Sequence, residues 1–162
     1  MMTEKSLTRE SIQAVNAIID GHIRRTPVVE VAGEDFGLRG LTLVFKLEFL
    51  QHAGSFKARG AFTHMLTRDV PAVGVVAASG GNHGAATAFA AARSGHQATI
   101  FVPSVASPAK VQQIRDYGAE LRIAGDHVRR SGQRLPLARR MLKQLRADEL
   151  SAQAAVVMET AP

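Results

Sequence analysis

The chain of 162 residues (17.3 kDa) is 46% hydrophobic and 21% charged, the composition of a globular protein that buries a core rather than of a disordered chain. It has no cysteine, which excludes disulfides, thiolate metal sites and a cysteine nucleophile, and no apolar run of the roughly 20 residues that cross a bilayer, so we expect a cytoplasmic protein without a membrane partner. The net charge is +6, but residues 127–162 hold 7 Lys/Arg against 3 Asp/Glu, and with one Tyr and no Trp to stack on bases a nucleic-acid partner is not expected.

The first 50 residues predict a helix followed by two extended segments. Apolar residues recur at helical spacing over residues 8–23, with Thr8 placed to cap the helix, which must end before Pro27. Residues 27–31 can run extended. Residues 41–47 alternate large apolar residues with others, so we expect a strand that buries one face.

Three helices and three further strands alternate in the middle of the chain. The helix predicted over 55–66 would be capped by Ser55 and would turn a set of apolar residues inward, namely Ala58, Ala61, Phe62 and Met65. Apolar runs and capping signals predict the remaining strands at 73–78, 98–102 and 119–123, and helices at 85–94 and 107–118. Counted from residue 41, the order βαβαβαβ indicates an α/β fold, a parallel sheet flanked by helices, with its ligand site at the carboxyl ends of the strands.

The composition changes after Asp126. Residues 127–162 are rich in arginine, carry no strand signal, and predict at most one basic helix, over residues 136–150.

Lys57 stands at the start of the helix predicted from Ser55. A lysine there is unfavourable by up to about 1 kcal/mol, because the positive end of the helix dipole repels a cation. A lysine that forms a Schiff base must be neutral part of the time, and nearby positive potential favours the neutral form. Lys57 is therefore either a solvated surface charge or a nucleophile.

A turn that contains consecutive glycines, Ser79-Gly80-Gly81-Asn82-His83-Gly84, joins a predicted strand to a predicted helix. Such a turn can bring backbone N–H groups close to an anion, although a plain glycine turn explains the pattern about equally well. Asn82 adds a directional amide. No Lys-Ser or Lys-Thr pair follows the glycines, which argues against a nucleotide-binding loop, and the six scattered histidines show no spacing of metal ligands.

Two segments, KLEFLQHAGSFKARGA (46–61) and AASGGNHGAATAFAAA (77–92), resemble the signature segments of the serine/threonine dehydratases, pyridoxal-phosphate enzymes of fold type II. Arg25-Thr26-Pro27 and residues 99–125 resemble further stretches of that family in the same order. The likeness covers about residues 8–126.

This resemblance implies a role for each matching residue. Lys57 would hold pyridoxal 5'-phosphate as a Schiff base and take the α-proton, Phe56 would lie beside the cofactor ring, and Asn82 would bond the ring's 3-oxygen. The turn Ser79, Gly80, Gly81, Asn82 and His83 would bind the substrate carboxylate. The family eliminates the hydroxyl of L-threonine or L-serine and gives a 2-oxo acid and ammonia, and a complete enzyme is expected to be a homodimer.

The resemblance also implies that parts of the enzyme lie outside this chain. The family's phosphate-binding glycine loop and its contact to the pyridine nitrogen are expected beyond residue 162. We therefore expect residues 1–52 to belong to a large domain that is mostly absent, residues 53–126 to form a small α/β domain, and residues 127–162 to be a divergent basic tail of a truncated or frameshifted copy with impaired activity.

Other functions stay open. The chain could be a non-catalytic remnant or an interaction protein, or a fold type II enzyme of another kind, such as a β-replacement synthase or a racemase. The serine racemases that the chain resembles carry a serine, used as a second base, where Gly80 stands here, which argues against racemisation.

Overall fold

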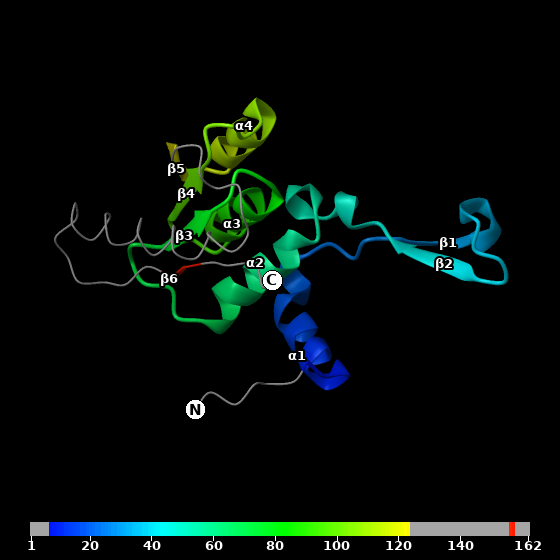
Figure 1. The fold of residues 1–162 in the computed structure, drawn as a ribbon. Helices are drawn as coiled ribbons and strands as arrows, with labels where there is room; N and C mark the ends of the chain where they lie inside the picture. The colour runs from blue at the N-terminus through cyan, green and yellow to red at the C-terminus, as the bar shows by residue number, and fades with distance from the viewer. Residues whose placement is uncertain (1–6, 124–155, 158–162) are drawn as a thin grey trace.

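The structure, a computed structural model, describes residues 7–123 and 156–157 (Figure 1). Its helices are α1 (Arg9–Ile19), α2 (Lys57–Thr67), α3 (Asn82–Arg93) and α4 (Pro108–Asp116), and its strands are β1 (Val28–Ala32), β2 (Thr42–Lys46), β3 (Val75–Ala78), β4 (Ala98–Val102), β5 (Glu120–Ile123) and β6 (Val156–Val157). Short 3₁₀ helices cover Asp20–His22, Gly33–Phe36, Glu48–Leu50 and His52–Gly54. None of the described helices is both long and apolar enough to cross a membrane.

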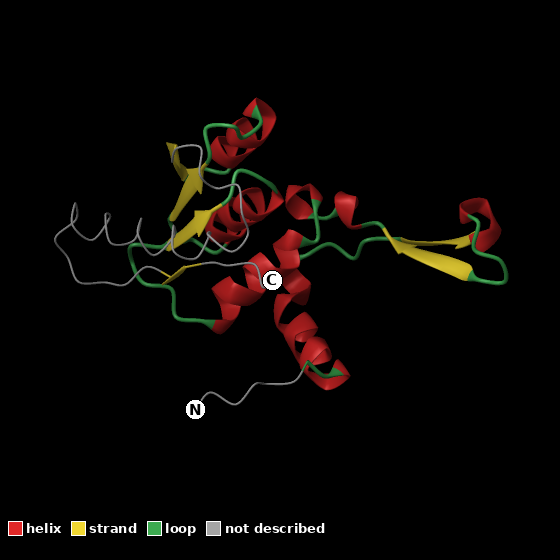
Figure 2. Ribbon diagram, in the orientation of Figure 1, coloured by secondary structure: helices red, strands yellow, loops and turns green. Residues whose placement is uncertain are grey.

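A parallel sheet of order β5-β4-β3-β6 forms the centre of the α/β unit (Figure 2). All four residues of β3 are buried, as the continuous apolar run predicts. The strands predicted at 73–78, 98–102 and 119–123 and the two helices that connect them are confirmed, as is the α/β class. Helix α4 begins as predicted, with the Ser107 side chain accepting from the N–H of Lys110 and Pro108 as the first helical residue.

Helix α3 packs closely against the sheet because its buried face is made of small residues. The buried residues are Gly84, Ala85, Ala86, Thr87, Ala88, Ala90 and Ala91. A Cβ atom at Gly84 would lie nearer than 3.0 Å to the carbonyl oxygen of Ser79, so no side chain fits there. The helix begins three residues earlier than predicted, at Asn82, and ends as predicted before Gly95, which has a φ of 74°.

Helices α1 and α2 pack against each other. Thr8 and Ser11 form a reciprocal capping box at the start of α1, which confirms the predicted cap. The four apolar residues predicted to turn inward on α2, Ala58, Ala61, Phe62 and Met65, are all buried. The division into domains at residues 52 and 126 stays a prediction.

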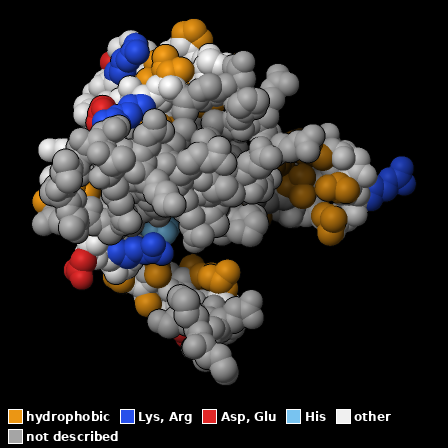
Figure 3. Space-filling view, turned by 60° about the vertical axis from the view of Figure 1, so that its left-hand side comes forward, with side chains coloured by type: hydrophobic (Ala, Val, Ile, Leu, Met, Phe, Trp, Pro, Cys, Tyr) orange, Lys and Arg blue, Asp and Glu red, His pale blue; other side chains and the backbone are white. Residues whose placement is uncertain are grey.

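The strand predicted over residues 41–47 forms, but its environment was predicted wrongly. β2 pairs antiparallel with β1 in a hairpin that projects from the α/β unit, outside the parallel sheet (Figure 1). Its side chains are not buried on one face, since Val44 is 61% and Phe45 41% exposed, and apolar side chains gather on the hairpin in Figure 3. The connection between the strands is too short for a parallel crossover, which needs a dozen residues or more. Gly33 instead closes the turn by donating to the carbonyl of Leu41 at 2.8 Å.

The prediction that no strand follows Asp126 was also wrong. β6 extends the sheet by pairing in parallel with β3, Val156 opposite Val75 and Val157 opposite Val76. A strand of two residues is too short for its periodicity to be read from a sequence. The basic helix predicted over residues 136–150 lies outside the described residues.

The close approach at Gly84 gives a first prediction. Gly84→Ala should destabilise the protein by roughly 2 kcal/mol or more, because the new methyl group meets the backbone of Ser79 and one of the two must move. Gly60→Ala is the matched control, since Gly60 lies within α2 with open space around it and alanine is the better helix former by about 0.5–1 kcal/mol. Urea unfolding followed by circular dichroism measures both. Equal stability of the two variants would contradict the close packing of α3.

Candidate functional site

Lys57 is the first residue of α2, as predicted, but the helix is not capped by Ser55. The N-cap residue is Phe56, which makes no side-chain cap, and Ser55 is extended, with φ −164° and ψ 162°. The Ser55 hydroxyl is buried, and among the described residues it has no hydrogen-bond partner. It therefore faces the interior, two residues before Lys57, instead of the first turn of the helix.

A tight turn sets the direction in which the chain enters α2. Ala53 and Gly54 both have left-handed backbone angles, with φ of 57° and 72°. Before them, the buried side chain of Gln51 accepts hydrogen bonds from the N–H groups of Arg24 and His52, both at 2.9 Å, and donates to the carbonyl of Arg24 at 2.7 Å. Gln51 thus ties residues 51–54 to the segment that follows α1.

The amine of Lys57 is half-buried beside an aromatic ring. Its nitrogen lies 4.8 Å from the centre of the Phe56 ring, within the range of a cation–π contact. Across the part of the chain that the structure describes, this amine forms no ion pair. The first turn of α2 contains no acidic residue. The structure therefore brings the two predicted cofactor residues of this segment into contact and leaves the amine available.

Sequence reasoning missed a polar cluster around Glu48. Arg59 of α2 binds the Glu48 carboxylate through two parallel hydrogen bonds, Nε to Oε2 at 2.9 Å and Nη2 to Oε1 at 2.8 Å. The hydroxyl of Thr26 donates to the same carboxylate at 2.6 Å, and Lys46 lies 3.6 Å from it. Lys46 also donates to the carbonyl and hydroxyl oxygens of Thr26. Chiefly because of the Arg59 hydrogen bonds, the pKa of Glu48 is lowered to about 2.

The glycine turn between β3 and α3 presents the start of a helix. Ser79 is buried, its N–H donates to the carbonyl of Phe101 at 2.9 Å, and its hydroxyl accepts from the N–H of Gly81 at 3.3 Å. Gly81 is the N-cap residue of α3 and supplies no side-chain cap, so the N–H groups of the first turn, which begins at the exposed Asn82, can serve another acceptor.

The two glycines of the turn differ in the space around them. A Cβ atom at Gly80 would lie 2.6 Å from the Cβ of Ala106 and 2.9 Å from the Cδ of Pro103. A Cβ atom at Gly81 would meet nothing within 4 Å. The loop of residues 103–106 therefore closes the turn at Gly80, whereas the turn is open at Gly81.

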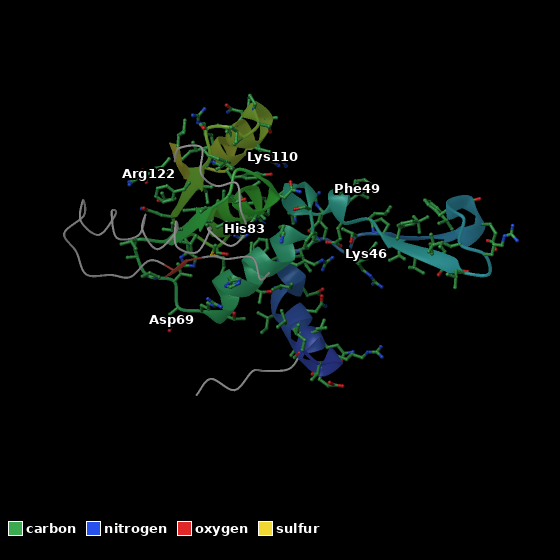
Figure 4. The ribbon with its side chains drawn as sticks, viewed as in Figure 1. Lys46, Phe49, Asp69, His83, Lys110 and Arg122 are labelled. Atoms are coloured by element: carbon green, nitrogen blue, oxygen red, sulfur yellow. The ribbon has the colours of Figure 1, made fainter. Side chains whose placement is uncertain are left out.

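The lysine segment and the glycine turn lie on helices that pack against each other. Phe62 of α2 and Phe89 of α3 meet edge to face, with ring centres 6.0 Å apart, and His52 stacks on Phe89 at 4.8 Å. The pKa of His64 on α2 is lowered by burial first, then by Arg68 and by His83, which lies at the start of α3 (Figure 4). No ion pair or hydrogen bond joins Lys57 to the turn within the described residues. These residues also contain no group of three or more His, Asp or Glu that could hold a metal ion.

The Glu48 cluster gives a prediction about pH. A carboxyl whose pKa is lower in the folded chain stabilises the fold above its unfolded pKa of about 4.5, and this stabilisation disappears as the pH falls toward 2. Glu48→Gln should therefore be less stable than the wild type by about 3 kcal/mol near neutral pH, and the difference should shrink between pH 5 and pH 2. Urea unfolding at several pH values measures it.

Glu120→Gln is the matched control, because Glu120 pairs with Arg122 at 2.7 Å but is 55% exposed and should contribute less than about 1 kcal/mol. A Glu48 difference that stays constant down to pH 2 would contradict the lowered pKa.

The comparisons with known proteins agree on the family. The model of the family "Pyridoxal-phosphate dependent enzyme" matches residues 19–157. The match continues past Asp126, where the sequence analysis ends the likeness, and it includes β6, so that boundary was wrong.

The relatives include several dehydratases. Phenylserine dehydratase of Ralstonia pickettii is 42% identical over 117 residues, which are 70% of this chain and 35% of that protein. L-threonine ammonia-lyase of Geobacter sulfurreducens is 38% identical over 117 residues, 70% of this chain and 29% of that protein. The chain thus spans about a third of the length of these relatives.

Solved structures have the same fold. Maize serine racemase has a TM-score of 0.75 at 31% identity, covering 93% of this chain and 43% of that one. A bacterial threonine deaminase, from T.th., has a TM-score of 0.66 at 33% identity, covering 85% of this chain and 42% of that one. Since the family model covers most of the sequence and these structures share its fold, the chain belongs to the family of pyridoxal-phosphate dependent enzymes of fold type II.

Proposed function

We propose that the chain carries the lysine segment and the substrate-carboxylate turn of a dehydratase, an ammonia-lyase that acts on small hydroxy amino acids such as L-threonine and L-serine. Relatives named as threonine and phenylserine dehydratases support this assignment. The observation that carries it is the closed turn at Gly80, because a side chain at this position would collide with Ala106 and Pro103.

The residues present fit the cofactor of the family. An aldehyde needs an amine, and Lys57 offers one that is half-buried beside the Phe56 ring and, among the described residues, in no ion pair. A polar ligand needs donors and room, and the site offers the buried hydroxyl of Ser55, the uncapped start of α3 and the open space at Gly81. Phe56 would lie beside the ring of pyridoxal phosphate, and Asn82 would donate to its 3-oxygen.

The reaction divides between the cofactor and the protein. Bound pyridoxal phosphate supplies the electron sink that makes the α-proton of the amino acid acidic. The N–H groups at the start of α3, in the turn Ser79–His83, hold the substrate carboxylate and so fix the orientation of the α-carbon. The freed amine of Lys57 takes the α-proton, and the β-hydroxyl leaves as water after it gains a proton. Addition of one water then releases the 2-oxo acid and ammonia.

Racemisation has some structural support, because maize serine racemase shares the fold. Inverting the α-carbon requires a second base on the face opposite Lys57. At Gly80, where the racemases carry a serine, the loop of residues 103–106 already occupies the space. This contact favours elimination over racemisation at the site.

The role of Lys57 can be tested on the chain as it stands. The protein is mixed with pyridoxal phosphate, reduced with borohydride, digested, and the label at each lysine is measured by mass spectrometry. We expect Lys57 to be labelled in excess of Lys46 and Lys110, and Lys57→Ala to lose this label while the others keep theirs. Uniform labelling of all lysines would contradict a built cofactor site.

Competition by amino acids tests the substrate class. L-threonine should lower the label at Lys57 more than the same concentration of L-valine, because both react with free cofactor but only L-threonine carries the β-hydroxyl that the site should recognise. Equal effects would contradict the proposal for hydroxy amino acids and would leave the role of Lys57 intact.

The closed turn at Gly80 gives a matched pair of variants. Gly80→Ser should cost about 1–3 kcal/mol of unfolding free energy, because its Cβ collides with the loop of residues 103–106. Gly81→Ser enters open space at a φ of −125° and should change the stability by less than about 0.5 kcal/mol. Thermal and urea unfolding measure both. If Gly80→Ser is as stable as Gly81→Ser, the turn has room for a serine and the argument against a racemase fails.

A further inference from the structure

The first turn of α2 carries two cations and nothing of its own to offset them. Lys57 and Arg59 are the first and third residues of the helix, its N-cap makes no side-chain bond, and no acidic residue lies in the turn. The helix dipole repels both cations. A group from outside the helix must therefore hold this turn in place.

Glu48 is that group, and its geometry fixes more than charge. The two parallel hydrogen bonds from Arg59, at 2.8 and 2.9 Å, set the plane of the guanidinium against the plane of the carboxylate. A single contact between point charges would leave the helix free to rotate about its axis, whereas two bonds restrict that rotation. Lys57 lies two residues away on the same turn, so any rotation would move its amine.

Glu48 is itself held from the other side. Thr26 donates to its Oε1, and Lys46 binds Thr26 through both the carbonyl and the hydroxyl oxygen. Lys46 ends β2, and Figure 4 shows it where the hairpin meets the rest of the molecule, close to Phe49. The carboxylate is thus fixed by a segment that precedes α2, in a part of the structure where Glu48 is only 18% exposed.

We propose that Glu48 is a positioning residue for the cofactor lysine: it locks the first turn of α2 through Arg59 and thereby sets where the amine of Lys57 stands. This inference rests on the proposed function, which makes Lys57 the cofactor-binding residue. It adds that Thr26, Glu48 and Arg59 act as one unit, in which the fork of the arginine is required as well as its charge.

The test uses the labelling assay at a fixed, neutral pH on folded protein. The readout is the ratio of label at Lys57 to label at Lys110, a lysine on α4 that reports on general reactivity. Glu48→Gln and Arg59→Lys should each lower this ratio about tenfold, since small displacements of a reacting group carry large penalties in rate. Arg59→Lys keeps the charge and loses only the fork, so it separates positioning from charge balance.

Glu120→Gln makes the same chemical change at the exposed Arg122 pair on β5 and should leave the ratio unchanged. Circular dichroism restricts the comparison to variants with the secondary structure of the wild type; if Glu48→Gln does not fold, Arg59→Lys alone decides. A wild-type chain without excess label at Lys57 would overturn the proposed function. A wild type that labels at Lys57 and an Arg59→Lys variant with the wild-type ratio would overturn the positioning role and leave the function standing.

Discussion

The close approach of α3 to the end of β3 is the constraint on which the α/β unit depends. Gly84 lets the first turn of the helix touch the backbone at Ser79, and the alanines that follow keep the rest of the helix near the sheet. The approach places the start of α3 directly at the carboxyl end of a fully buried strand, where ligands of parallel α/β folds bind. Packing and site therefore have the same origin, since the small residues that fill the core also bring the N–H groups of an uncapped helix start to the ligand side of the sheet.

The elements of this unit could be predicted from the sequence because their signals are local. β3 is a continuous apolar run, α4 has a serine cap followed by proline, and α3 ends at a glycine with positive φ. The hairpin could not be predicted in the same way. The alternation of β2 fixes that it is a strand, but its partner and its exposure depend on the path of the chain, and two of its apolar side chains, Val44 and Phe45, remain exposed. β6 has two residues and no pattern at all.

The candidate site shows the same division. The position of Lys57 at a helix start and the glycine turn after β3 were predicted, because each is set within one short segment. The partner of Arg59 was not, although Thr26, Glu48 and Arg59 all lie inside segments that resemble the family. Their hydrogen bonds join residues 11 to 22 positions apart, and no spacing rule connects such positions. Ser55 was misread for a related reason, since its hydroxyl turns inward, and tertiary structure decides that choice.

Gly80 and Gly81 show how far two adjacent residues of one type can differ in function. The sequence presents them as one flexible pair, and flexibility would explain both. In the structure neither has a positive φ, so the reason for glycine is space and not backbone freedom. At Gly80 the space is already taken by Pro103 and Ala106, and any side chain must displace them; at Gly81 the space is open and lies at the start of a helix without a cap. One glycine thus excludes a group from the site, and the other leaves room for a ligand to enter it.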